Sequence, residues 1–414
     1  MAISFPLMLQ VEKLQTEPAL DSPRAWVVVA AAFLASFVSF GVTYSFGVFL
    51  KPMAAEFHAR HFFIIALFSA EALVSCALTP LTGRIADRFG PRPLMFVGAL
   101  LMGTGLLFSA QVHSLPLLFI TYGIGLGAAV ACIYIPAMAA VGKWFKVHRP
   151  IAVGTAMSGV GCGTLVVAPL AAVMVDRYGW RSAFTLFAWT SAVLLLLCAA
   201  LLFRPPATMA KTRASIAGAL RTRTFFFLYA SLLFGRVAVY VAMLYLPPFA
   251  DSIGITRVAG AALVGYIGGA SIAGRLGFNA LAARFGLLEI YRVTYGVALA
   301  SFAAWLVADS YWPMLVFAMV LGLGYGGLAA MYNPVTASIF GVERLGELLG
   351  ILFTGFGLGS LIGPPVAALL VDETQNYHYP IFVATAAAAL AFVLVLPLKK
   401  HALTENKRSA AAAS

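Results

Sequence analysis

Two arginines and one glutamate lie where charged side chains are rare, inside apolar runs long enough to cross a bilayer. Arg275 lies in the run 258–286, and Arg236 and Glu71 lie in two other runs. A charge at the bilayer centre costs about 2.5 kcal/mol or more, so each side chain should face a partner or a water-filled cavity. Guanidinium groups bind carboxylate or phosphate oxygens in pairs. We therefore predict an anion site within the membrane, centred on Arg275; the alternative is a structural arginine that binds carbonyl groups of a neighbouring helix.

Further candidate substrate ligands lie near the two arginines. Ser271 and Asn279 precede and follow Arg275 by one helical turn, which places all three on one face. Tyr240 lies one turn from the other arginine, and Tyr332 lies in a later apolar run. Tyrosines within membrane helices also serve as packing or interfacial residues, and this alternative stays open for both.

Glu71 is the candidate for proton coupling. It lies near the middle of its apolar run, where desolvation favours a neutral carboxyl group and a nearby arginine favours the ionised form. If Glu71 pairs with Arg236 or Arg275, a substrate carboxylate would compete for the arginine and the released Glu71 would take up a proton. The alternative is a fixed Glu71–Arg236 ion pair that only orders the helices.

The composition excludes a soluble protein. Hydrophobic residues make up 62% and charged residues 10% of 414 positions, and the mean hydropathy is +0.95. The apolar runs are continuous and of helix length, so the chain is predicted to be an all-α integral membrane protein. We find no nucleophile with a base and no spacing of metal ligands, and the four cysteines lie apart in apolar runs. We expect no enzyme activity, cofactor, metal or disulfide.

The basic residues report the orientation of the chain. The net charge is +12, and of the 27 Lys and Arg, 20 lie in tails and loops on the side of the N-terminus, 5 in loops on the other side and 2 within spans. This asymmetry predicts that both termini are cytoplasmic. Because membrane topology explains the positive net charge, we expect no nucleic-acid partner. We expect a multi-pass plasma-membrane protein, in a bacterial inner membrane, that works as a monomer.

Twelve spans can be counted, in two halves of six. They cover residues 26–50, 62–82, 93–111, 115–141, 151–174, 184–203, 225–247, 258–282, 287–308, 311–339, 348–371 and 380–398. The expected organisation is a cytoplasmic tail (1–25), a six-helix bundle (26–203), a basic cytoplasmic linker (204–224), a second six-helix bundle (225–398) and a cytoplasmic tail (399–414).

The two halves are internal copies. DRFG at 87–90 recurs as ARFG at 283–286, an offset of 196 residues. At the same offset seven residues recur: Gly154, Gly159, Gly161, Gly163, Pro169, Val175 and Asp176 match Gly350, Gly355, Gly357, Gly359, Pro365, Val371 and Asp372. Parallel six-span repeats are typical of secondary transporters, whose site lies between the halves and opens alternately to each side.

The segment GRIADRFGPR at 83–92 resembles the loop signature of the major facilitator superfamily. In such a loop Gly83 permits close helix approach, Asp87 can lie at a neighbouring helix N-terminus, and Arg88 and Arg92 stay at the cytosolic face. We expect these four residues to form a conformational latch, which holds the inner side closed in one state and releases it in the other.

Within that superfamily, the chain resembles the monocarboxylate transporter family and its bacterial relatives of the oxalate and formate type. The resemblance is carried by YIPAMAAVGKWFKVHRPIAVGTAMSGVGCGTLVVAPL and GWRSAF, and it covers nearly the whole chain. Arg275 falls where that family has a substrate arginine. The lysine that animal members carry in the first span falls at or near Tyr44, which becomes a candidate ligand, and the acidic residue four before the arginine is Ser271. The family's usual proton and carboxylate partners are therefore incomplete here.

These observations predict a carrier for a small organic anion. The resemblance implies a monocarboxylate such as lactate or pyruvate, moved with a proton as co-substrate (symport) or by exchange. A dicarboxylate such as oxalate, or a drug-like compound, is the alternative, because two arginines can hold two carboxylates. A membrane sensor built on a transporter fold is a third possibility, although the sequence shows no appended soluble domain.

Overall fold

The computed structural model describes residues 20–145, 148–203, 217–341 and 345–398, and these residues form helices and no strand. The first half contains α2 (Pro23–Tyr44), α3 (Phe46–Glu56), α4 (His61–Phe89), α5 (Pro91–Ser109), α6 (Leu115–Leu118), the π-helix η1 (Phe119–Leu126), α7 (Gly127–Trp144) and α8 (Arg149–Leu201). The second half contains α9 (Ala217–Leu220), α10 (Arg223–Ser252), α11 (Arg257–Phe285), α12 (Leu287–Leu306), α13 (Tyr311–Phe340), α14 (Leu345–Thr374) and α15 (His378–Val395).

The predicted twelve-helix membrane fold is confirmed. Eleven helical segments in the described residues are long and apolar enough to span a membrane. One of them, α8, has 53 residues and would be about 80 Å long if straight, far more than a bilayer core of about 30 Å. It is broken at Gly179, where φ is 79° and ψ is 164°, so α8 supplies two passes. The predicted tails and most of the predicted linker lie outside the described residues, and the domain boundaries stay predictions.

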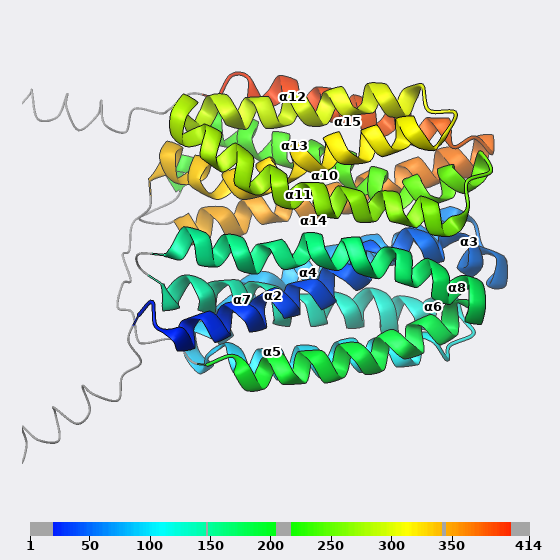
Figure 1. Cartoon of the computed structure of the whole chain (residues 1–414), viewed down its shortest axis with the longest axis horizontal. Helices are drawn as coiled ribbons and strands as arrows, with labels where there is room; N and C mark the ends of the chain where they lie inside the picture. The colour runs from blue at the N-terminus through cyan, green and yellow to red at the C-terminus, as the bar shows by residue number, and fades with distance from the viewer. Residues whose placement is uncertain (1–19, 146–147, 204–216, 342–344, 399–414) are drawn as a thin grey trace, which may run out of the picture.

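The helices form two bundles that lie side by side. Figure 1 shows α2–α8 in one layer and α10–α15 in the other. Within the first bundle α8 packs against α2 and α5, and within the second α13 packs against α11 and α12. The bundles meet mainly along α4 with α14, α8 with α11, and α3 with α10.

Small residues bring the bundles into backbone contact. A Cβ atom at Gly268 on α11 would lie 2.6 Å from the carbonyl oxygen of Gly161 on α8, and a Cβ atom at Gly161 would collide with the Gly268 carbonyl in return. Only glycine permits this approach, which is a common means of helix association in membranes. The contact fixes α8 and α11 against each other beside the centre of the protein.

The internal repeat is visible in the backbone. α4 ends at Gly90 with φ of 90°, and α11 ends at Gly286 with φ of 98°, the two glycines that the 196-residue offset equates. Positive φ at a helix end favours glycine, because a Cβ atom would be strained there. The described chain starts at residue 20 and ends at residue 398 at the same end of the bundles, which we call the tail end, and the opposite end is the far end (Figure 1).

Candidate functional site

A cavity of about 80 Å³ lies between the two bundles. Four helices of the first bundle (α2, α4, α7, α8) and four of the second (α10, α11, α13, α14) contribute to its wall. One water needs about 10–15 Å³ of such volume, so the cavity has room for roughly five to eight groups of that size. Its charged lining residues are Glu71, Arg236 and Arg275, the three that the sequence singles out.

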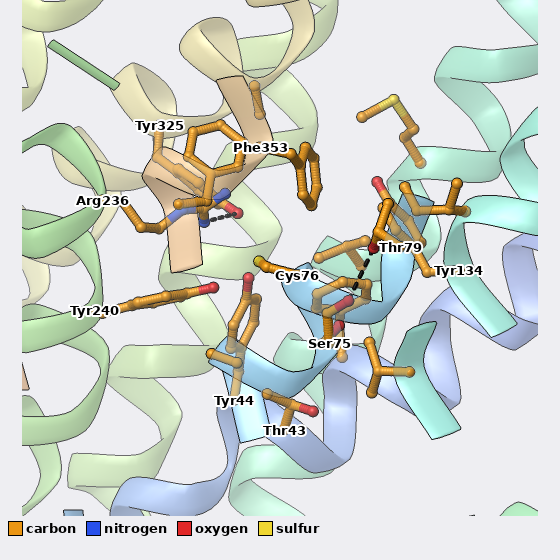
Figure 2. Close-up of a pocket in the computed structure, with 18 of the residues that line it drawn as sticks. Thr43, Tyr44, Ser75, Cys76, Thr79, Tyr134, Arg236, Tyr240, Tyr325 and Phe353 are labelled. Carbon is orange, nitrogen blue, oxygen red and sulfur yellow. Dashed lines mark hydrogen bonds between the residues drawn. The ribbon is translucent and has the colours of Figure 1, made fainter. Parts of the chain in front are cut away.

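Arg236 projects from α10 into an aromatic surround (Figure 2). Its guanidinium carbon lies 4.2 Å from the ring centre of Phe356, 4.9 Å from that of Tyr240 and 5.7 Å from that of Tyr325. Its Nη1 donates to the Tyr325 hydroxyl at 3.4 Å. It forms no ion pair with any acidic residue in the described part of the chain.

Arg275 lies on α11 and reaches the other bundle. Its Nη1 donates to the backbone carbonyl of Met157 on α8, and the residue is 5% exposed. Its Nε is buried and has no hydrogen-bond partner among the described residues. In this conformation Arg275 therefore combines both interpretations of the sequence: it lines the cavity and it binds a carbonyl of a neighbouring helix.

Glu71 is 2% exposed and hydrogen-bonds a neutral partner. Thr43 Oγ1 on α2 donates to Glu71 Oε1 at 3.4 Å. No ion pair joins Glu71 to either arginine within the described residues. The expected Glu71–Arg236 pair, as a fixed structural element or as a resting state, is absent from this conformation.

Tyrosines from both halves line the cavity. Tyr44 and Tyr240 stand 196 residues apart, and their ring centres are 6.1 Å apart across the bundle interface. Tyr134 and Tyr332, the matching residues of α7 and α13, also line it. Tyr325 of α13 is the fifth tyrosine in the cavity wall. The repeat therefore places equivalent phenols on opposite walls, while both arginines come from the second bundle.

Two of the predicted ligands do not line the cavity. Ser271 is buried and its hydroxyl donates to the Gly268 carbonyl of its own helix at 2.6 Å, and Asn279 is exposed. Both lie one helical turn from Arg275, but this stretch of α11 runs along α8 and α13, whose backbones cover Ser271, and neither residue reaches the cavity in this conformation. The seven-residue spacing of Tyr325 and Tyr332 places both on one helix face and so indicates Tyr325 from the sequence, whereas Thr43 and Met157 have no such signal.

The predicted latch residues lie at the tail end (Figure 1), where Asp87 joins two helices of one bundle. Asp87 Oδ1 on α4 accepts from Lys143 Nζ on α7 at 2.6 Å. Arg88 lies over the ring of Phe89, and Arg92 is exposed. A Cβ atom at Gly83 would meet nothing within 4 Å, so the close helix approach expected there is absent from this conformation.

Ion pairs and hydrogen bonds join the two bundles at the far end. Lys51 on α3 pairs with Asp251 on α10, and Arg257 on α11 pairs with Asp176 on α8. At the start of α4, Asp372 of α14 accepts from two backbone amides and the His61 ring. The offset of 196 equates Asp176 with Asp372 and His61 with residue 257, so the two closures are copies of one contact. The internal sequence repeat identifies the two aspartates but not the residues that they contact.

The chain matches known transporters over most of its length. The model of the Major Facilitator Superfamily matches residues 32–310 and 293–413. Monocarboxylate transporter 11 of Homo sapiens is 30% identical over 381 residues, which cover 86% of this chain and 79% of that protein. Monocarboxylate transporter 3 of Rattus norvegicus is 28% identical over 395 residues, which cover 91% of this chain and 80% of that protein. Monocarboxylate transporter 13 of Rattus norvegicus is 28% identical over 391 residues, which cover 90% of this chain and 88% of that protein.

These matches confirm the predicted family and the prediction of a transporter rather than an enzyme. The structure itself has eleven candidate membrane helices among the described residues and a cavity between its two bundles (Figure 1). The chain is a multi-pass membrane protein of the major facilitator superfamily and belongs to its monocarboxylate transporter family.

Proposed function

We propose that the protein is a secondary active transporter for a small monocarboxylate, such as lactate or pyruvate, which it moves by alternating access. The observation that carries this proposal is the cavity between the bundles, lined by two arginines that have no carboxylate partner among the described residues. Two unneutralised guanidinium groups inside a membrane protein favour an anionic ligand that supplies the missing charge.

The size of the cavity supports a small substrate. A volume of about 80 Å³ has room for roughly five to eight groups of the size of water, and pyruvate and lactate have six non-hydrogen atoms each. The neighbouring apolar and phenolic side chains would contact the rest of the substrate. A drug-like compound would need a much larger space than this conformation offers.

The asymmetry of the two ends supports alternating access. At the far end the bundles are joined by Lys51 with Asp251, by Arg257 with Asp176, and by Arg60 and His61 with the carboxylates of Asp372 and Glu373. The tail-end contact of Asp87 lies within one bundle. A state in which ion pairs hold the bundles together at one end is one of the two states that a rocking carrier needs. With the tails in the cytoplasm, as the charge bias predicts, this state faces inwards in the plasma membrane.

Glu71 is our candidate for the proton-binding residue. It is buried in the cavity wall, contacts Thr43 and forms an ion pair with neither arginine among the described residues in this conformation. Transport of a proton together with the anion would keep the charge of the cavity constant through the cycle. Substrate exchange without a net proton is the alternative, and we expect the carrier to act as a monomer in either case.

A dicarboxylate such as oxalate is the second candidate substrate. The presence of two arginines on one cavity favours it, because each could bind one carboxylate. Thermal unfolding of the purified protein with a panel of short acids separates the candidates, since a ligand that binds only the folded state raises its stability. We expect stabilisation by lactate or pyruvate; stabilisation by oxalate alone would select the dicarboxylate, and stabilisation by none of the acids would contradict both.

A further inference from the structure

We propose that Arg236 is the first ligand of the substrate carboxylate, that Tyr325 positions it, and that Arg275 acts as a clasp between the bundles until the substrate draws it away from Met157. This inference rests on the proposed function. It assigns different roles to two arginines that the sequence treats as alike, and it departs from the resemblance, which places the substrate arginine at Arg275.

Arg236 is held by three rings from three helices, which we call the aromatic clamp: Tyr240 of α10, Tyr325 of α13 and Phe356 of α14. The guanidinium carbon lies between 4.2 and 5.7 Å from the three ring centres. The rings are themselves braced, because Phe356 contacts Phe353 and Tyr240 contacts Phe68 edge to face. A cation over aromatic faces is stabilised electrostatically, and most strongly where water is excluded. The clamp thus compensates part of the cost of a buried charge.

The clamp leaves most of the donors of Arg236 available. A guanidinium has five N–H groups, which point outward in its plane, whereas aromatic faces contact the flat surfaces. The Tyr325 hydroxyl, at 3.4 Å from Nη1, is the acceptor that the described residues provide. Tyr325 therefore sets the rotation of the guanidinium plane and leaves an edge toward the cavity for a carboxylate (Figure 2).

Arg275, in contrast, already hydrogen-bonds a backbone carbonyl of the other bundle. Its hydrogen bond to the Met157 carbonyl joins α11 to α8, hence one bundle to the other. Any rotation of one bundle against the other changes this contact. The Nε of Arg275 is a buried donor without an acceptor among the described residues. A carboxylate accepts a hydrogen bond from a guanidinium more strongly than a carbonyl group does. A substrate bound at Arg236 can compete with Met157 for Arg275 and so link occupancy to the movement of the bundles.

The roles separate in experiments that measure binding and transport independently. Arg236→Lys and Arg275→Lys each keep the charge but lose the paired donors. In the purified full-length protein we expect Arg236→Lys to raise the Kd for pyruvate by about tenfold or more by calorimetry. We expect Arg275→Lys to change that Kd by less than about threefold but to slow counterflow of labelled pyruvate in proteoliposomes by about tenfold or more.

Tyr325→Phe tests the positioning role and carries the test if Arg236→Lys does not fold. It removes one hydroxyl from the clamp and keeps the ring, so we expect a Kd about three- to tenfold higher than in the parent. Tyr291→Phe is the matched control, since Tyr291 is a buried tyrosine of α12 whose hydroxyl contacts Tyr295 outside the cavity. Equal Kd values for the two phenylalanine variants would contradict the positioning role.

Other results would contradict the separate roles proposed for Arg236 and Arg275. A large loss of affinity in Arg275→Lys with normal affinity in Arg236→Lys would reverse it, and equal losses in both would overturn it; either result leaves the proposed function intact. A parent protein that binds none of pyruvate, lactate and oxalate would contradict the proposed function itself.

Discussion

The closure of the far end predicts that Asp372→Asn shifts the protein toward states open at that end. Asp372 Oδ1 accepts from the backbone N of His61 at 3.0 Å and from its Nδ1 at 2.9 Å, and Oδ2 accepts from the backbone N of Phe62 at 2.9 Å. Arg60 Nε lies 3.6 Å from the same carboxylate. The Asp372 side chain is 5% exposed, so solvent screens these contacts weakly.

The magnitude follows from what an asparagine side chain retains in place of the Asp372 carboxylate. The amide would keep one carbonyl oxygen that can accept from a backbone N–H at the start of α4, but it would lose the second acceptor and the negative charge. Hydrogen bonds to charged groups contribute about 1.5–3 kcal/mol, and a charge at a helix N-terminus about 0.3–1 kcal/mol. Allowing for the contact that remains, we expect the closed state to lose about 1–2 kcal/mol, which changes its population relative to the open state by roughly 5- to 30-fold.

Cys76 provides the assay, because it lines the cavity and is partly exposed there. A membrane-impermeant maleimide added from the far side should modify Cys76 about 5 to 30 times faster in Asp372→Asn than in the parent, with Cys76→Ala as the background. Asp176→Asn is the matched control from the repeat. Its carboxylate is 41% exposed and faces Arg257, so its loss should contribute about 0–1 kcal/mol. Unchanged labelling in Asp372→Asn, or a larger increase in Asp176→Asn, would refute this reasoning.

Three other predictions concern proton coupling, helix packing and orientation. Glu71→Gln should abolish uptake driven by a proton gradient and leave substrate exchange intact; unchanged gradient-driven uptake would remove Glu71 from the mechanism. Gly268→Leu should prevent the close contact of α11 with Gly161 and lower the apparent Tm by several degrees, whereas Gly277→Leu, where a Cβ atom meets nothing within 4 Å, should not. Arg221→Cys should be labelled from the cytoplasmic side of the membrane, and labelling from outside intact cells alone would contradict the topology.

Most of the fold could be predicted because it follows from length and apolarity. Runs of about 20 apolar residues can satisfy their backbone only as membrane helices, and the 196-residue repeat divides them into equal halves. The one segment that the structure shows as a single long helix, α8, was correctly divided into two spans, since Gly179 lies in the short stretch between them.

The site could be predicted only in part. Charge inside an apolar run identifies Arg236, Arg275 and Glu71 without any structure, because such residues are costly unless they serve a site. Their partners could not be predicted: the Met157 carbonyl and Thr43 lie on other helices, and a backbone acceptor has no sequence signal. The pairing of Glu71 with an arginine was expected from charge alone, but geometry decides such pairs, and in this conformation Thr43 is the partner.

We propose that a monocarboxylate binds at the arginines between the bundles and crosses the membrane there. Counterflow of labelled pyruvate into proteoliposomes preloaded with unlabelled pyruvate tests it most directly, with the parent beside the folded double variant Arg236→Gln/Arg275→Gln. We expect accumulation of label by the parent and none by the double variant. No accumulation by the parent, or equal accumulation by both proteins, would contradict it.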